Sequence, residues 1–132
     1  MLETPISRSF PAEPAQLEEV RRFVARAAEE ARLPEHTTDD LVIVANEAAT
    51  NSIRHSGTTR FHVRWLVLDD RVEIEIEDEG LFKRRIRVHQ LDGAGGLGIP
   101  LMMSLTDEFE LHEGTPGRPG TRTRLVKFHS AD

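Results

Sequence analysis

The glycine-rich run GAGGLGIPLM, residues 93–102, is well suited to holding phosphate. Four of its first six residues are glycine, and a helical pattern follows directly. The backbone amides of such a loop can wrap phosphate groups at a helix N-terminus, where the helix dipole favours anions. It is neither a Walker loop nor a dinucleotide fingerprint, because no Gly-Lys-Ser/Thr follows and no strand runs directly into it. A flexible linker is the alternative interpretation.

The acidic strand end IEDEG, residues 76–80, is suited to recognising a base. A carboxylate such as Asp78 can accept a hydrogen bond from the exocyclic amine of adenine, and Gly80 would let the backbone approach the ring. Asp-Glu-Gly is also an ordinary turn sequence. This segment alone therefore leaves both interpretations open.

The stretch NEAATNSIRH, residues 46–55, places polar side chains within a helical pattern. At about 100° per residue, Glu47, Asn51 and His55 form a row along the helix edge. The predicted buried stripe of the same helix consists of Leu41, Ala45, Ala48 and Ser52. A polar row that borders the core indicates either a functional site or an ordinary solvated flank.

Two helices are predicted ahead of these segments. Apolar residues at helical spacing predict the first from Pro14 to Ala31. The second is predicted to begin after a cap at Thr37 or Thr38 and to run to Gly57. Its first turn would carry two acidic residues, Asp39 and Asp40.

Alternating patterns predict five strands. These are a possible edge strand at SRSF, a hairpin of FHVRWLVL and VEIEIED joined through Asp69-Asp70-Arg71, and two closing strands, DEFELHE and TRTRLVKFH. The order is strand, two helices, two strands, a short helix and two strands. We therefore expect an α+β fold, a two-layer sandwich with mostly antiparallel strands and helices on one face.

Composition narrows the classes of function. A chain of 132 residues fits one domain, residues 1–132. Without cysteine it has no disulfide or thiolate metal site, and no run approaches 18 apolar residues, so we expect a cytoplasmic protein without a membrane span. The formal net charge of −6 argues against nonspecific nucleic-acid binding and favours a protein partner or a small ligand.

Taken together and in this order, NEAATNSIRH, DEG, GGLGI and Gly120-Thr121 resemble the N, G1, G2 and G3 boxes of the Bergerat ATP-binding fold. Gyrase, MutL and histidine kinases share that fold. Within the superfamily the chain is most similar to the RsbW-type anti-sigma factors, which are serine-protein kinases. The resemblance implies ATP or ADP and Mg²⁺ as cofactors, a homodimer, and two partners: a sigma factor and a STAS-type anti-anti-sigma factor that is phosphorylated on serine.

The resemblance also implies roles for the residues of the N box. Asn51 would coordinate Mg²⁺, and Glu47 would be the general base that takes the proton from a serine hydroxyl. Their spacing supports this, because an oxygen ligand and a base four residues apart on a helix can meet at the γ-phosphate. Arg54 or His55 would contact the phosphates, with a surface-facing position as the alternative.

The other boxes supply the nucleotide contacts. Asp78 would bind adenine, helped by Thr121 through ordered solvent, and Gly80 would leave room for the ring. The phosphate loop would use Gly93, Gly95, Gly96, Leu97, Gly98 and Ile99.

Two features depart from the superfamily pattern. Phe82 stands where many members have the second glycine of the G1 box, and only 12 residues separate Gly80 from Gly93, which makes a short ATP lid. The lid carries a basic run of Lys83, Arg84, Arg85 and Arg87, which could reach phosphates or a partner or be solvated. These departures favour the alternative function, a non-catalytic sequestering module, whereas Glu47 and Asn51 favour the kinase.

Overall fold

The computed structural model describes residues 5–55, 57–80 and 98–129. Its elements are β1 (Ile6–Pro11), the 3₁₀ turn η1 (Pro14–Gln16), α1 (Leu17–Glu30), α2 (Glu35–His55), β2 (Arg60–Val67), β3 (Arg71–Asp78), α3 (Ile99–Leu105), β4 (Glu108–Thr115) and β5 (Arg118–Phe128). This order agrees with the one that the sequence patterns predict.

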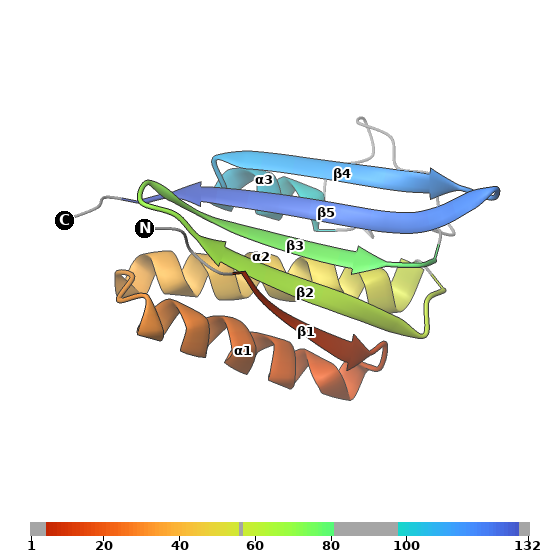
Figure 1. Ribbon diagram of the computed structural model, residues 1–132, viewed down its shortest axis with the longest axis horizontal. Coiled ribbons are helices and arrows are strands. Elements are labelled where there is room, and N and C mark those ends of the chain that lie inside the picture. The colour runs from red at the N-terminus through yellow and green to blue at the C-terminus, as the bar shows by residue number, and fades with distance from the viewer. Residues whose placement is uncertain (1–4, 56, 81–97, 130–132) are drawn as a thin grey trace.

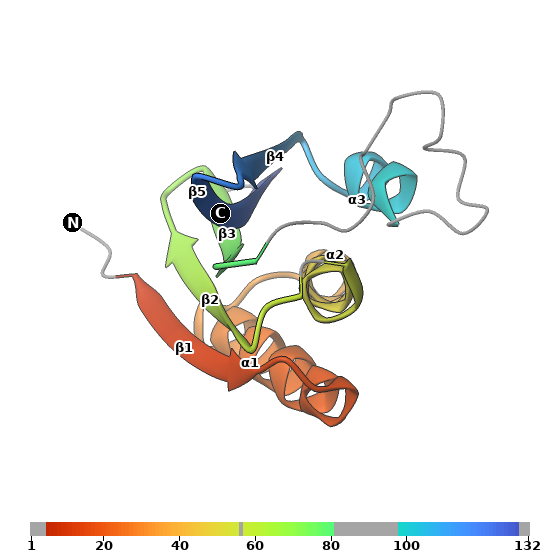
Figure 2. The same ribbon diagram turned by 90° about the vertical axis from the view of Figure 1, so that its right-hand side faces the viewer.

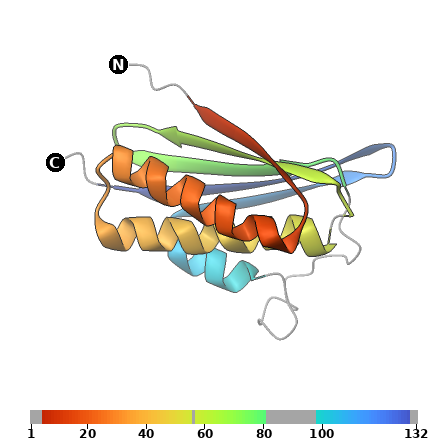
Figure 3. The same cartoon turned by 90° about the horizontal axis from the view of Figure 1, so that it is seen from below.

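The five strands form one sheet in the order β1-β2-β3-β5-β4. Every strand pair in the described residues is antiparallel, so the expected mostly antiparallel sheet has no parallel pair there. The helices lie on one face of the sheet, and α2 lies between α1 and α3 (Figures 1 and 2). Seen from the helical side, α1 and α2 run next to each other (Figure 3). The predicted two-layer α+β architecture is confirmed.

The core lies between the sheet and the helices. Alternate residues of the central strands face the helices, because successive side chains of a strand point to opposite faces. Buried residues on this face of the central strands include Phe61, Val63, Trp65, Val72, Ile74, Ile76, Thr123 and Leu125. They pack against buried residues of the two long helices: Val20, Val24, Ala27, Ala28, Leu41, Val44, Ala45, Ala48 and Ala49. The same alternation directs Asp78 and Thr121 toward the helical layer.

The predicted start of the second helix is wrong. The helix begins at Glu35, because the backbone N–H of Thr38 already donates to the carbonyl of Pro34 at 2.9 Å. Proline suits a helix start, since it has no N–H to lose there. Thr37 is therefore a buried helical residue rather than a cap.

The acidic residues after the threonines consequently fall beyond the first turn. Asp40 forms an ion pair with Lys127 of β5, 3.1 Å from carboxylate oxygen to ammonium nitrogen. The Lys127 ammonium also donates to the carbonyl of Leu105 at 2.9 Å. Lys127 thereby links α2, β5 and the end of α3.

The face of the sheet opposite the helices carries an ion-pair network centred on Glu73. Its carboxylate accepts a hydrogen bond from Arg71 at 2.8 Å and lies 3.2 Å from the Arg124 guanidinium. Arg124 also pairs with Glu108 and Glu110, at 3.3 and 3.0 Å. The hydrogen bond from Arg71 lowers the pKa of Glu73 below its ordinary value, with a further contribution from Arg124.

This network predicts a pH-dependent contribution to stability. A carboxyl group whose pKa is lowered by folding stabilises the fold above its unfolded pKa of about 4.3, and that contribution disappears as the pH falls through the lower folded value. Glu73→Gln should therefore lower the free energy of unfolding by about 1 kcal/mol at pH 7, and by progressively less below about pH 4.3. Urea unfolding at pH 7 and pH 3 measures both values.

Glu77→Gln is the matched control, because Glu77 is an exposed residue of the same strand with no ion pair in the described part of the chain. It should change stability by less than about 0.5 kcal/mol at either pH. A Glu73→Gln effect of the same size at pH 7 and pH 3 would contradict the assigned cause.

Candidate functional site

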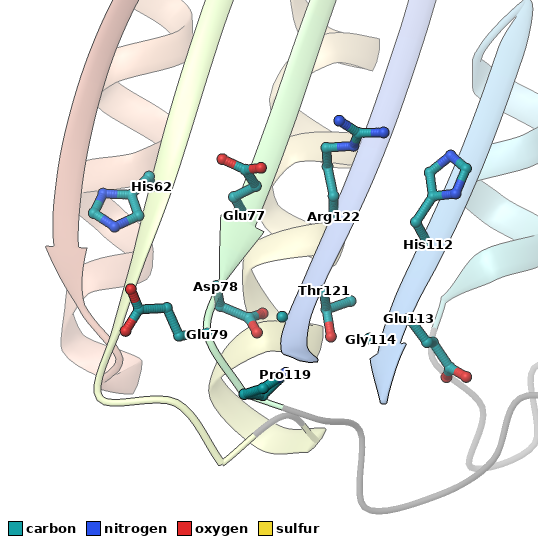
Figure 4. A pocket seen from close by; sticks show the side chains of 11 residues that line it. His62, Glu77, Asp78, Glu79, His112, Glu113, Gly114, Pro119, Thr121 and Arg122 are labelled. Atoms are coloured by element: carbon teal, nitrogen blue, oxygen red, sulfur yellow. The ribbon is translucent and has the colours of Figure 1, made fainter. Parts of the chain in front are cut away.

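The candidate residues that the structure describes gather at one end of the sheet. Asp78 ends β3 and is paired across the strands with Thr121 of β5. The two residues are 5% and 3% exposed, respectively, and Figure 4 shows them next to each other. The helix α2 lies against this end and contributes Ser52, whose hydroxyl reaches Asp78.

Hydrogen bonds from Ser52 and Gly80 reach the two oxygens of the Asp78 carboxylate. The Ser52 hydroxyl donates to Oδ2 at 2.7 Å, and the backbone N–H of Gly80 donates to Oδ1 at 2.9 Å. Thr121 does not contact the carboxylate in this way; its hydroxyl donates to the carbonyl of Gly80 at 3.3 Å. The Asp-Glu-Gly turn is thus tied to both α2 and β5, which fixes the direction of the carboxylate.

Gly120, next to Thr121, has a backbone that favours glycine. Its φ is +144°, and a Cβ placed there would lie 3.3 Å from the backbone carbonyl oxygen of Asp78. A side chain would press on the strand that carries the candidate base-binding carboxylate. The glycine therefore lets β5 approach β3 closely at the site.

Asn51 is more deeply placed than its predicted position at the helix edge. It is 3% exposed, so the edge assignment is corrected for this residue, while Glu47 is half-buried. The next residue, Ser52, is hydrogen-bonded to Asp78, so the end of β3 lies against this turn of α2. The Asn51 amide makes no hydrogen bond to another described residue. Every fully enclosed side-chain nitrogen or oxygen in this part of the structure has a hydrogen-bond partner, so the amide is not fully enclosed and faces space that solvent can reach.

Glu47 lies against Gly98, the residue that precedes α3. Gly98 caps this helix with a left-handed backbone, φ +71°, and a Cβ there would contact the Glu47 carboxylate, with Cδ at 3.0 Å. A glycine thus leaves room for the carboxylate. Ile99, the next residue, is 2% exposed and anchors α3 in the core.

Several predicted residues have no described position. Gly93, Gly95, Gly96 and Leu97 lie outside the described residues, as do Phe82 and the basic run of the predicted lid. Arg54 is exposed near the end of α2, and the side chain of His55 is not described. The structure therefore brings together Glu47, Asn51, Asp78, Gly80, Gly98 and Thr121, and the roles assigned to them remain predictions.

Ser52 is a candidate functional residue that the sequence patterns do not single out. They predict it as part of the buried stripe, and it is indeed 3% exposed. The available signal is its polarity within a stripe that is otherwise leucine and alanine. A buried hydroxyl needs a hydrogen-bond partner, and that partner is the carboxylate 26 residues further along the chain.

A hollow of about 910 Å³ adjoins the strand ends (Figure 4). It is lined mainly by side chains of the open face of the sheet, such as His62, Glu77 and Arg122. Asp78 and Thr121 also line it, although the alternation of the strands directs their side chains toward the helices. The candidate site lies on the helical side of these two residues, between the strand ends and α2 and α3.

The candidate site differs from a preformed metal centre. Across residues 5–55, 57–80 and 98–129, no three His, Cys, Asp or Glu side chains are grouped so that they could hold a metal ion. Mg²⁺ commonly takes one or two protein ligands together with phosphates and water, so a single amide such as Asn51 is compatible with it.

Among the described helices, none is long and apolar enough to cross a membrane.

The fold and these residues define a class of protein. A profile of the histidine kinase-like ATPase domain matches residues 10–127, which is most of the chain. The chain therefore belongs to the histidine kinase-like ATPase domain family.

Similar proteins specify the branch of that family. The chain is 29% identical to the serine-protein kinase RsbW of Bacillus pumilus, over 93% of this chain and 85% of that protein. It is 30% identical to the serine-protein kinase RsbW of Bacillus licheniformis, over 93% of this chain and 84% of that protein. These matches place the chain among the RsbW-type serine-protein kinases, and the resemblance drawn from the four boxes is confirmed.

A solved structure supports the fold independently. The structure of the RsbU and RsbW domains of Rv1364c from Mycobacterium tuberculosis superposes with a TM-score of 0.73 at 18% identity. The match covers 95% of this chain and 32% of that one. At this identity the likeness concerns the fold alone.

Proposed function

We propose that the protein binds Mg-ATP between α2, α3 and the ends of β3 and β5, and transfers the γ-phosphate to a serine of a STAS-type anti-anti-sigma factor. The observation that carries the proposal is the placement of Asn51. The residue is 3% exposed, and its amide, which faces space that solvent can reach, has no hydrogen bond to the described part of the protein. A hydrated cation with phosphates in that space would give the amide a partner.

The proposed roles of the site residues in phosphate transfer follow from the positions of their side chains. Bound Mg²⁺ would neutralise the phosphate charge, with the Asn51 oxygen as its ligand from the protein. Glu47, one turn earlier on α2, would accept the proton of the serine hydroxyl as its oxygen bonds to the γ-phosphorus and ADP leaves. Gly98 permits this by leaving the Glu47 carboxylate room beside the start of α3.

At the other end of the site, the Asp78 side chain would accept a hydrogen bond from the exocyclic amine of adenine. The turn at Gly80 and the neighbouring Thr121 would complete this end, with ordered solvent between Thr121 and the base. Asp78 and Asn51 come from β3 and α2, and the Ser52 hydroxyl connects these elements at 2.7 Å. The adenine and phosphate ends of the nucleotide would thus be held by one rigid unit.

Membership of the RsbW family supports the rest of the proposal. The protein would bind a sigma factor and release it when the STAS partner competes, acting as a cytoplasmic homodimer. The formal net charge of −6 agrees with protein partners rather than nucleic acid as the direct target. The alternative is a sequestering module of the same fold without phosphate transfer, which the short lid and Phe82 favour.

Transfer of labelled phosphate decides between kinase and module. With γ-labelled ATP, Mg²⁺ and STAS proteins encoded near this one, we expect label on one STAS serine, and none after that serine is changed to alanine. Addition of EDTA should stop the transfer, because the phosphate charge then lacks its counterion. Nucleotide binding without transfer to any of these STAS proteins would support the module instead.

A further inference from the structure

We infer that Ser52 is a positioning residue that holds the Asp78 carboxylate as an acceptor for the exocyclic amine of adenine, and so sets the preference of the site for adenine nucleotides. This inference rests on the nucleotide site proposed above. It assigns a specific task to a residue that otherwise belongs to the packing stripe of α2.

The hydrogen bond is well placed for this task. The Ser52 hydroxyl and Asp78 Oδ2 are 2.7 Å apart, and the two residues are 3% and 5% exposed. At the other oxygen, the Gly80 N–H donates at 2.9 Å. A carboxylate whose two oxygens both accept hydrogen bonds from the protein cannot rotate freely without losing one of them. The direction in which it faces a ligand is therefore set before binding.

A carboxylate held in one direction selects the ligand group that faces it. Its oxygens accept hydrogen bonds and donate none, and each can accept more than one. An amine, as at C6 of adenine, can donate to such an oxygen. A carbonyl oxygen, as at C6 of guanine or hypoxanthine, would instead face another acceptor, and an unpaired buried polar group is costly.

Ser52 also connects the two halves of the site. It follows Asn51 directly on α2, whereas Asp78 lies at the end of β3. A shift of α2 relative to the sheet would therefore change the orientation of Asp78 through this bond. An alanine at position 52 would match the rest of the stripe in packing but would leave Oδ2 without that donor.

The test compares two ligands in two Ser52 variants. The ligands are Mg-ADP and the diphosphate of purine riboside, which lacks the amine at C6, and calorimetry measures the dissociation constants. Ser52→Ala should weaken ADP binding about 10-fold, the typical effect of one hydrogen bond to a charged group, and should change binding of the amine-free analogue by less than about twofold. Ser52→Cys, with a similar size and a weak donor, should behave in the same way.

Thr50→Val is the matched control. The Thr50 hydroxyl donates to the backbone carbonyl of Asn46 within α2, at 2.7 Å, and the replacement removes a hydroxyl from the same helix without touching Asp78. Its affinities for both ligands should equal those of the parent. Melting temperatures measured without ligand show whether each variant is folded.

The result that overturns the inference is specific. If both Ser52 variants lose affinity for ADP and for the amine-free analogue equally, Ser52 only supports the fold; if neither variant loses affinity for ADP, it has no part in binding. ADP binding by the parent is measured first, which separates a failure of the proposed nucleotide site from a failure of the inferred role of Ser52. A parent that does not bind ADP overturns the proposed nucleotide site and this inference with it, whereas a parent that binds and variants that match it overturn the inference alone.

Discussion

Replacing Glu47 with glutamine should slow transfer of phosphate from ATP to the STAS serine by about 10²-fold or more. The reason is that glutamine keeps the shape of the side chain beside Gly98 but cannot accept a proton as a base. ADP affinity should stay within about twofold, since this side chain would face the attacking hydroxyl rather than the adenine. Single-turnover phosphorylation and calorimetry with ADP measure the two quantities.

Asp39→Asn is the control for the loss of one negative charge in Glu47→Gln. Asp39 is an exposed residue of the same helix, two turns before Glu47, and its replacement removes the same charge. Its transfer rate should remain close to that of the parent. If Glu47→Gln phosphorylates as fast as the parent, Glu47 is not the base.

Replacing Asp78 with asparagine should abolish the stabilisation that nucleotide gives to the parent. At 100 times its dissociation constant, Mg-ADP should raise the free energy of unfolding of the parent by about 2.7 kcal/mol, or the melting temperature by roughly 5–15 °C. Asparagine has one acceptor oxygen in place of two and carries an amide donor, so it cannot accept from Ser52, Gly80 and adenine together. Melting curves with and without Mg-ADP measure the shift.

Glu77→Gln is the neighbouring control. Glu77 precedes Asp78 but is exposed on the opposite face of the sheet, so its variant should keep the full shift with Mg-ADP. The melting temperature of Asp78→Asn without nucleotide reports the separate cost of changing a buried, hydrogen-bonded group. A variant that is folded and still shows the parental shift would exclude Asp78 as the base-binding residue.

The periodic elements of this protein can be predicted from sequence with good accuracy. Strict alternation in VEIEIED, where Val72, Ile74 and Ile76 are buried, suffices to predict β3 and its two faces. The short link after FHVRWLVL likewise predicts the antiparallel hairpin, and the observed pairing of Val67 with Val72 matches it. Such features are local, because backbone geometry alone imposes the period of two on a strand.

The candidate site is less local, and sequence alone predicts it only in part. The four boxes identify the segments that meet, and the family matches bear out that resemblance. The predicted start of α2 is wrong because threonine is a good helix cap in general, whereas here Pro34, which precedes the helix, already supplies its first carbonyl acceptor. The preference of threonine for cap positions therefore did not decide where the helix begins.

The tertiary structure alone decided which polar side chains of α2 became deeply placed and what they meet. The spacing of Glu47 and Asn51 assigns both to one row, yet of the two only Asn51, in the turn that meets the end of β3, is buried. The partner of Ser52 is 26 residues away, and the space filled by the Glu47 carboxylate depends on a glycine at position 98. Periodicity determines the direction of a side chain around its own helix, but only the packing of a second element determines which atoms stand opposite it.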